Sequence, residues 1–257
     1  MSRTLLAMAG HRFFVPAEKI HSETALIEGD EAHHLRRVLR LAVGDEVRVF
    51  DSSGREWRAV IEQTSIQQVI LRLLEPFDNE VESPIAITLA QGLIKGERFE
   101  LVLQKAVELG ISALQPFTSR YTDVQLSEAR AEKRLERWQR IVLEATKQSG
   151  RRRLMSILPP LSWAELIRQI NRPALLFAEQ GGHSLTSISD QLKTLQPTAI
   201  TAIVGSEGGW SREELAQAEA AGFHLVTLGP RILRTETAGI MAAVLLQYLY
   251  GDLGEIS

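Results

Sequence analysis

The sequence contains no cysteine. This absence excludes disulfide bonds, metal sites built on thiolates and a cysteine nucleophile, and it suits a reducing compartment. Positive charge is not in excess either, because 29 Lys and Arg stand against 32 Asp and Glu, a formal net charge of −3. With no global basic field to attract nucleic acid, any contact with RNA must come from local patches.

Long hydrophobic runs are also missing. The longest apolar stretch, 238–250, is too short to cross a bilayer and indicates a core helix. The amino terminus carries Arg3 but only about seven weakly apolar residues before His11, too few for a signal peptide. With 44% apolar and 24% charged residues among 257, the composition is typical of a soluble globular protein of one large or two modest domains. We therefore expect a cytoplasmic protein.

Residues 1 to about 80 have the composition of a small β-rich unit. Strand patterns cover 12–15, 46–50, 57–63 and 68–74, with a hairpin turn at 51–54. One helix is expected at 32–41, capped by Asp30. It carries five basic side chains, His33, His34, Arg36, Arg37 and Arg40. They form either a solvated helix face or an RNA-binding surface. The unit as a whole is acidic, with ten Lys and Arg against thirteen Asp and Glu, so the clustering of basic residues on this helix supports the RNA-binding interpretation as much as the solvated one.

A linker is expected at 76–84, where two prolines and three acidic residues interrupt all apolar periodicity. We place the domain boundary there, giving domains 1–78 and 79–257. Beyond it, strand patterns alternate with helix patterns, which predicts an α/β domain with a parallel sheet covered by helices on both faces. The expected strands are 85–90, 111–117, 174–178 and 199–204, and the expected helices are 97–109, 128–148, 162–170 and 187–195.

The long helix and its exit are strongly basic, with nine Lys and Arg and three Glu between residues 130 and 153. Pairs within the helix, such as Glu136 with Arg140, account for part of this charge. They do not account for the run 151–153, which is three consecutive arginines. We interpret this run as unpaired and available to RNA phosphates, rather than as a solvated helix end.

Two glycine-punctuated loops concentrate the chemistry of the chain. The first, G-S-E-G-G-W at 205–210, follows an apolar run typical of a strand buried on both faces of a parallel sheet, and such strands carry ligands at their carboxyl ends. Its glycines let a ligand approach the backbone, whereas Glu207 disfavours a phosphate and favours a neutral or cationic ligand. Ser211 and Glu214 form a capping box for the helix that follows. A structural turn without a ligand is the alternative.

The second loop, L-G-P-R-I-L-R-T-E-T-A-G at 228–239, alternates arginine and glutamate with apolar residues and threonine. A structural ion-pair network is the alternative to a ligand site. The sequence has no dinucleotide-binding motif, which argues against redox chemistry, and its six histidines show no metal-ligand spacing, which argues against metal catalysis. The G-x-S-x-G elbow of a serine hydrolase does not occur either. Group transfer from a bound small molecule remains.

Together the two loops resemble the signature of the RsmE family, uridine-N3 methyltransferases of small-subunit (16S) ribosomal RNA in the SPOUT superfamily. R-I-L-R-T-E-T-A at 231–238 is the most specific segment. One departure is Ser206, where the family usually has proline. Supporting motifs run along the whole chain: H-R-F-F-V at 11–15, H-H-L-R-R-V-L-R at 33–40, K-G-E-R-F-E at 95–100, K-A-V-E-L-G at 105–110 and Q-S-G-R at 148–151.

The resemblance implies a SPOUT-type parallel sheet with a carboxy-terminal trefoil knot, preceded by a small PUA-like β-barrel domain that binds RNA. It implies S-adenosyl-L-methionine as cofactor, ribosomal RNA as partner, a homodimer in which each active site is completed across the interface, and no metal. Two alternatives stay open: a non-catalytic RNA-binding module, and a SPOUT methyltransferase that acts on another RNA or on a ribose hydroxyl.

Methylation at uracil N3 requires loss of a proton, so the site needs a proton acceptor and groups that stabilise an anion. Arg231 and Arg234 are the candidates to stabilise the anion or to orient a phosphate. The sequence leaves the choice of proton acceptor open between Glu207 and Glu236. The expected cofactor-binding residues are Gly205, Glu207, Gly208, Gly209, Leu228, Gly229, Ile232, Leu233, Thr237 and Ala238. The expected RNA-binding residues are Arg12, Arg36, Arg37, Lys95, Arg98, Arg151 and Arg152.

Overall fold

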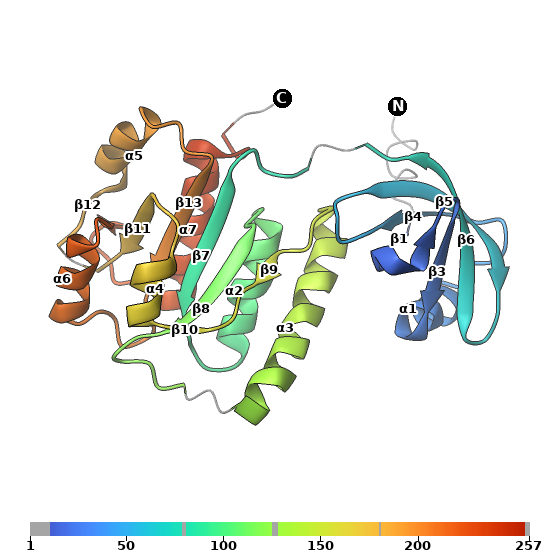
Figure 1. The fold of residues 1–257 in the computed structure, drawn as a ribbon, viewed down its shortest axis with the longest axis horizontal. Helices are drawn as coiled ribbons and strands as arrows, with labels where there is room; N and C mark the ends of the chain where they lie inside the picture. Colours follow the sequence, from blue (N-terminus) through green and yellow to red (C-terminus); the bar gives the residue numbers. More distant parts are fainter. Residues whose placement is uncertain (1–10, 79–80, 125–127, 180, 255–257) are drawn as a thin grey trace. The chain divides into compact units, whose positions relative to one another are not determined.

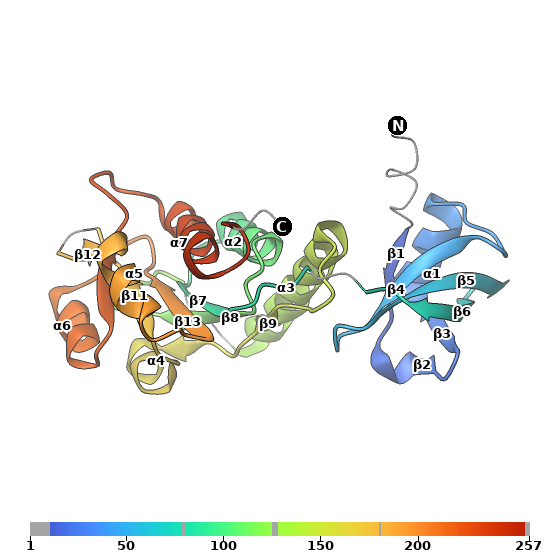
Figure 2. The same ribbon diagram turned by 90° about the horizontal axis from the view of Figure 1, so that it is seen from above.

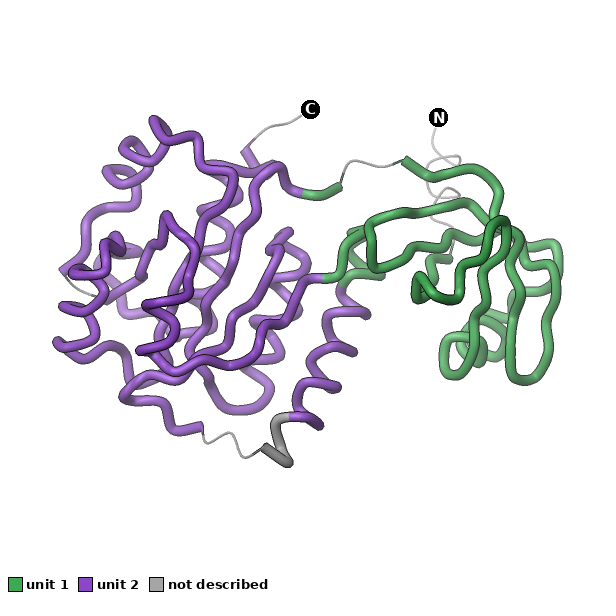
Figure 3. Tube along the Cα trace, viewed as in Figure 1, with its two compact units in different colours: residues 1–82, 146–154 green, residues 83–145, 155–257 purple. Residues whose placement is uncertain are grey.

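The computed structural model describes residues 11–78, 81–124, 128–179 and 181–254 (Figure 1). The expectations about the amino-terminal segment with Arg3 and about the middle of the linker, 79–80, lie outside these residues. The chain divides into two compact units (Figure 3): unit 1 comprises Met1–Glu82 and Thr146–Leu154, and unit 2 comprises Ser83–Ala145 and Met155–Ser257. Within the described ranges, no helix is long and apolar enough to cross a membrane.

Unit 1 is a six-stranded sheet in the order β1-β4-β5-β6-β3-β2, antiparallel except for the β1–β4 pair. Four of its strands occur where the sequence predicts them. The other two were missed because β2 has two residues and β3 buries only Ala25 and Ile27, too few for a clear alternation. The strands are β1 (Arg12–Phe14), β2 (Ile20–His21), β3 (Thr24–Glu28), β4 (Glu46–Phe50), β5 (Glu56–Thr64) and β6 (Gln68–Pro76), and a 3-10 turn, η1 (Ala17–Lys19), precedes β2.

The helical segment of unit 1 packs Ala32 and Leu35 into the core formed by the inward-facing strand residues. It consists of α1 (Gly29–His33), continued in a π-helical turn, η2 (His34–Val38). The prediction that Asp30 caps this helix is wrong, because the cap position is Glu28 and Asp30 lies in the first turn. There its carboxylate is still favoured by the positive end of the helix.

Unit 2 is a parallel sheet in the order β10-β8-β7-β13-β11-β14-β12, with β9 beside β8. Figure 2 shows α2 and α7 on one face of this sheet and α4 and α6 on the other, so the predicted parallel sheet with helices on both faces is confirmed. The strands are β7 (Ala86–Gly92), β8 (Ala113–Thr118), β9 (Ser156–Ile157), β10 (Leu161–Ser162), β11 (Ala174–Phe177), β12 (His183–Ser184), β13 (Ala199–Val204) and β14 (His224–Thr227). The helices are α2 (Glu97–Glu108), α3 (Glu128–Ser149), α4 (Trp163–Gln169), α5 (Leu185–Lys193), α6 (Arg212–Ala220) and α7 (Thr235–Tyr250), and the end of α3 from Thr146 onward belongs to unit 1.

Local signals in the sequence set most of these helix ends. Ser162 and Ser211 each form the predicted capping box, with Glu165 and Glu214 respectively. The last helix, α7, begins at Thr235, three residues before the expected start at 238. Its first turn, Thr-Glu-Thr, is polar, so apolar periodicity alone could not include it.

Candidate functional site

A cavity of about 310 Å³ lies in unit 2 where three neighbouring strands end together. In the parallel register, Phe177 at the end of β11 pairs with Val204 of β13 on one side and with Val226 of β14 on the other. The loops that follow β13 and β14 are the two glycine-punctuated loops, and both line the cavity. The carboxyl ends of parallel strands are where ligands bind in such sheets.

The first loop packs tightly against its neighbours at Gly205 and Gly208. A Cβ at Gly205 would lie 3.0 Å from Trp210 Cε2, and one at Gly208 would lie 2.3 Å from Tyr121 Cβ. Gly92, at the end of β7, faces the same loop, because its Cβ would meet the Ser206 amide nitrogen at 2.5 Å. Glycine at these positions therefore permits the close packing of the loop.

The Trp210 ring closes the loop against the end of β11. Its Nε1 donates to the Phe177 carbonyl oxygen at 3.0 Å, and the ring stacks on Phe117 with centroids 5.9 Å apart. The α6 cap follows directly, and its Glu214 carboxylate also accepts from the Arg120 amide at 2.8 Å. The loop is thus anchored to two neighbouring segments of unit 2.

Ser206, the departure from the usual proline, makes hydrogen bonds that a proline could not make. It is 5% exposed, and its hydroxyl donates to the Tyr121 carbonyl oxygen at 3.2 Å. The same hydroxyl lies 3.4 Å from the Ser119 hydroxyl. Hydrogen bonds to 119–121 therefore restrain the loop here, in place of a proline ring.

A buried glutamine joins the two loops. Gln91, at the end of β7, donates through Nε2 to the Thr235 hydroxyl at 2.9 Å, and that hydroxyl donates to the Gly205 carbonyl oxygen at 2.5 Å. Gly239 makes room for Gln91, since a Cβ there would lie 2.5 Å from Gln91 Oε1. The start of α7 and the first loop are held together by this contact.

Six charged side chains line the cavity, three carboxylates and three guanidinium groups: Glu179, Glu207, Glu236, Arg98, Arg231 and Arg234. Arg98 Nη1 and Glu207 Oε1 form an ion pair at 2.6 Å, with side chains 44% and 31% exposed. Glu236 is 8% exposed, and its Oε2 is buried without a hydrogen-bond partner in the described structure. Within the described ranges no group of three or more His, Asp or Glu could hold a metal ion.

The structure brings nearly all the predicted catalytic and cofactor-binding residues to one cavity. Two are placed elsewhere: Gly208 packs against Tyr121, and Thr237 is exposed on α7. The predicted residues that line it are Gly205, Glu207, Gly209, Leu228, Gly229, Arg231, Ile232, Leu233, Arg234, Glu236 and Ala238. The lining residues that the sequence-based set lacked are Phe177, Ala178, Glu179, Val204, Ser206, Trp210 and Thr235, while Arg98 was predicted as an RNA contact.

Glu179 is the most notable of the missed residues, because it places a third carboxylate in the cavity. It directly follows the predicted strand 174–178. Glu179 could be predicted only by knowing that β11 lies between β13 and β14 in the sheet. The order of the strands along the sequence does not reveal this placement.

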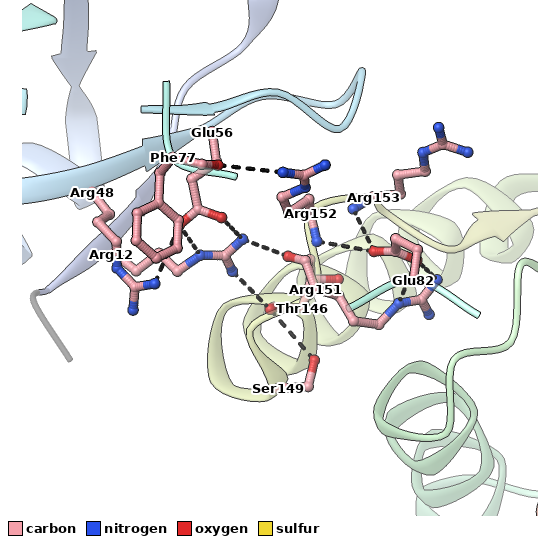
Figure 4. Close-up of polar contacts among 10 residues, drawn as sticks. All are labelled: Arg12, Arg48, Glu56, Phe77, Glu82, Thr146, Ser149, Arg151, Arg152 and Arg153. Carbon is pink, nitrogen blue, oxygen red and sulfur yellow. Dashed lines mark hydrogen bonds and ion pairs between the residues drawn. The ribbon is translucent and has the colours of Figure 1, made fainter. Parts of the chain in front are cut away.

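The interpretation of 151–153 as an unpaired arginine run is wrong for Arg151 and Arg152. Figure 4 shows Arg151 against Glu82, and Arg152 against the Phe77 carbonyl oxygen, within unit 1. Arg151 is 4% exposed and pairs with Glu82 at 2.8 Å. Arg152 pairs with Asp78 at 3.0 Å and donates to the Phe77 carbonyl oxygen. The partners lie about 70 positions earlier in the sequence, so rules for pairs within a helix could not identify them.

Arg12 is also occupied by contacts inside unit 1. Its guanidinium forms two hydrogen bonds of 2.9 Å to the Glu56 carboxylate, and the two side chains are 6% and 1% exposed. It donates as well to the carbonyl oxygens of Thr146 and Arg151 (Figure 4). Arg12 therefore fixes the segment 146–154 to the strands of unit 1.

The other predicted RNA contacts are accessible. Arg37 is exposed on the π-helical turn and Arg36 is half-buried beside it. Lys95, in the loop before α2, is 62% exposed and pairs with Asp123 at 3.3 Å. Arg98 follows three residues later, at the cavity.

Comparison with known proteins adds independent information. Residues 81–247 match the family described as RNA methyltransferase domain, and 27–74 match the RNA methyltransferase PUA domain. A ribosomal RNA small subunit methyltransferase E from Synechocystis is 36% identical over 235 residues, which cover 90% of this chain and 75% of the relative. The protein of the same name from Bacillus subtilis is 29% identical, with 92% and 96% covered. Among solved structures, that of a ribosomal RNA small subunit methyltransferase E from Neisseria gonorrhoeae bound to S-adenosyl methionine has a TM-score of 0.85 and 36% identity, covering 95% of this chain and 99% of that one.

Proposed function

Because the chain belongs to the RsmE family, whose RNA methyltransferase domain its residues 81–247 match, we propose that it methylates N3 of a uridine in small-subunit (16S) ribosomal RNA, with S-adenosyl-L-methionine as methyl donor. The observation that carries this proposal is that both glycine loops line the same cavity. A ligand there lies at the carboxyl ends of three parallel strands, against backbone that glycine leaves open.

The lining of the cavity fits this methyl donor. Its volume of about 310 Å³ lies at the lower end of the range for small-molecule sites. Leu228, Ile232 and Leu233 supply apolar surface for an adenine ring, and a Cβ at Gly229 would meet no atom within 4 Å, so the backbone is open there. When bound, the donor supplies an electrophilic methyl group on its positively charged sulfur.

The charged side chains of the second loop suit the other half of the reaction. Uracil N3 must lose its proton, and the negative charge that develops on the base has to be stabilised. Arg231 and Arg234 line the cavity from the segment that leads into α7, where they are exposed. We assign them to the stabilisation of that charge or to the orientation of an RNA phosphate.

RNA contact is assigned to the accessible basic residues. Arg36 and Arg37 in unit 1, and Lys95 in unit 2, are able to reach phosphates without breaking a buried contact, whereas Arg98 is paired with Glu207 at the cavity. Arg12 and Arg151 are instead assigned a structural role, since their side chains are 6% and 5% exposed and already paired. Arg152, with a side chain 22% exposed, could serve both purposes.

We also propose the domain division and the homodimer that the sequence predicts. A PUA-like domain at 1–78 and a methyltransferase domain at 79–257 agree with the two family matches, 27–74 and 81–247. A trefoil knot formed by the segments around the cavity, a homodimer and a cytoplasmic location follow from family membership. Met241 and Tyr248, which are 38% and 62% exposed on α7, offer apolar surface to a second copy. Sedimentation of the purified protein tests the homodimer.

Calorimetry with S-adenosylmethionine, followed by nucleoside mass spectrometry of ribosomal RNA, tests the proposed activity. Cells that lack the protein should lack 3-methyluridine in small-subunit RNA, and the purified protein should restore it. RNA binding without donor binding would favour the non-catalytic module. Donor binding with a methyl group on another RNA or on a ribose hydroxyl would favour a different SPOUT activity.

A further inference from the structure

The two carboxylates that the sequence offers as proton acceptors differ in what surrounds them. Glu207 is engaged, because its Oε1 lies 2.6 Å from Arg98 Nη1 and the pair is partly open to solvent. A carboxylate held by a guanidinium has its negative charge compensated, and protonation would break a charge-assisted hydrogen bond. This pairing makes Glu207 a poor candidate for taking up a proton.

Glu236 is in the opposite situation. It is 8% exposed, it lines the cavity, and its Oε2 is buried without a hydrogen-bond partner among the described residues. A buried carboxylate oxygen without a hydrogen-bond partner destabilises the folded protein unless a ligand or a water molecule donates a hydrogen bond to it. Its place in the first turn of α7 supplies a favourable helix dipole, but no hydrogen bond to that oxygen.

Neighbouring contacts fix where Glu236 lies. The residue before it, Thr235, is bonded to Gln91 and to the Gly205 carbonyl oxygen, which holds the start of α7 against the first loop. Glu236 therefore sits on a rigid element rather than on a mobile loop, as a group that moves a proton needs to. Glu179, the third carboxylate of the cavity, is exposed.

We propose that Glu236 accepts the N3 proton of the target uridine, an inference that rests on the proposed function. The N3 proton moves to the Glu236 carboxylate, and the N3 electron pair forms the bond to the methyl carbon. The electrons of the broken methyl–sulfur bond stay on sulfur, which becomes a neutral thioether, and Glu236 then returns the proton to solvent. Glu207 and Arg98 act as a pair that shapes the cavity.

Three variants of the full-length protein test this assignment: Glu236→Gln, Glu207→Gln and the control Glu219→Gln, which changes an exposed residue of α6. Donor affinity is measured by calorimetry, and single-turnover methyl transfer is measured against pH. The transfer assay uses RNA with uridine or with 5-fluorouridine at the target position. Fluorine makes the N3 proton more acidic, so a substrate carrying it depends less on a base in the protein.

We expect Glu236→Gln to bind the donor within about twofold of wild type and to transfer methyl to uridine about 10²- to 10⁴-fold more slowly at neutral pH. High pH or 5-fluorouridine should restore much of its rate, because the proton then leaves without the carboxylate. Neither condition should restore any loss seen with Glu207→Gln.

Two results would overturn the assignment: a Glu236→Gln rate on uridine close to that of wild type, or an equal loss on both substrates at every pH together with weakened donor binding. The second result would make Glu236 a donor-binding or structural residue. If the wild-type protein itself transfers no methyl to uridine N3, the proposed function fails instead, so the two failures are distinguishable.

Discussion

Replacing Arg12 with methionine should destabilise unit 1 rather than weaken RNA binding alone. The Glu56 side chain is 1% exposed, and Arg12 gives it two hydrogen bonds of 2.9 Å. Among the described ion pairs its other cation is Arg48, at 3.6 Å. Loss of Arg12 leaves a buried charge with a poor partner, a change that typically costs about 3–5 kcal/mol. It also frees the carbonyl oxygens of Thr146 and Arg151 that Arg12 now satisfies.

Amide hydrogen exchange in β4 and β5 measures this loss in unit 1 itself, since a change in global unfolding would mix both units. Arg37→Met, at an exposed arginine, is the matched control and should leave exchange unchanged. The double variant Arg12→Met/Glu56→Gln removes the buried charge and should recover a large part of the stability. If Arg12→Met lost less than about 1 kcal/mol while RNA affinity fell several-fold, Arg12 would be an RNA contact and the structural assignment would be refuted.

Three further predictions concern the cavity and the acid stability of unit 1. Gly92→Ala should abolish measurable donor binding in calorimetry while the fold is retained by circular dichroism, because its Cβ would meet the Ser206 amide nitrogen at 2.5 Å. Ser206→Ala should weaken donor binding about fivefold in the same assay, since it removes a buried hydrogen bond worth about 1 kcal/mol. Burial raises the pKa of Asp51, but hydrogen bonds from Ser53 and Arg55 outweigh it and leave that pKa below the usual 3.8. A depressed pKa contributes stability that is present above the unfolded pKa and is lost as pH falls through the folded pKa. The exchange protection factors of β4 and β5, which correct for the pH dependence of the exchange chemistry, should therefore fall below about pH 4, and Asp51→Asn should lessen this acid dependence.

The elements that could be predicted from sequence are those whose signal is local. The apolar run 199–204 and the capping boxes at Ser162 and Ser211 depend on neighbouring residues, and the structure confirms them. Elements with too few buried residues, such as β2 and β3, carry no periodicity to detect. The ion pairs of the arginine run depend on contacts between distant segments, so a count of nearby charges could not tell a buried arginine from a free one.

The two loop motifs alone do not predict that the cavity forms. The two loops are separated in sequence but flank one strand, β11, and both line one cavity because β13 and β14 are its two neighbours. The contacts that hold the loops together come from outside either motif, since Gln91 binds Thr235 and Gly92 leaves space for the first loop. A chain could therefore carry both motifs intact and still lose the cavity through a side chain at position 92. The loops supply the candidate chemical groups, and the end of β7 determines whether those groups meet.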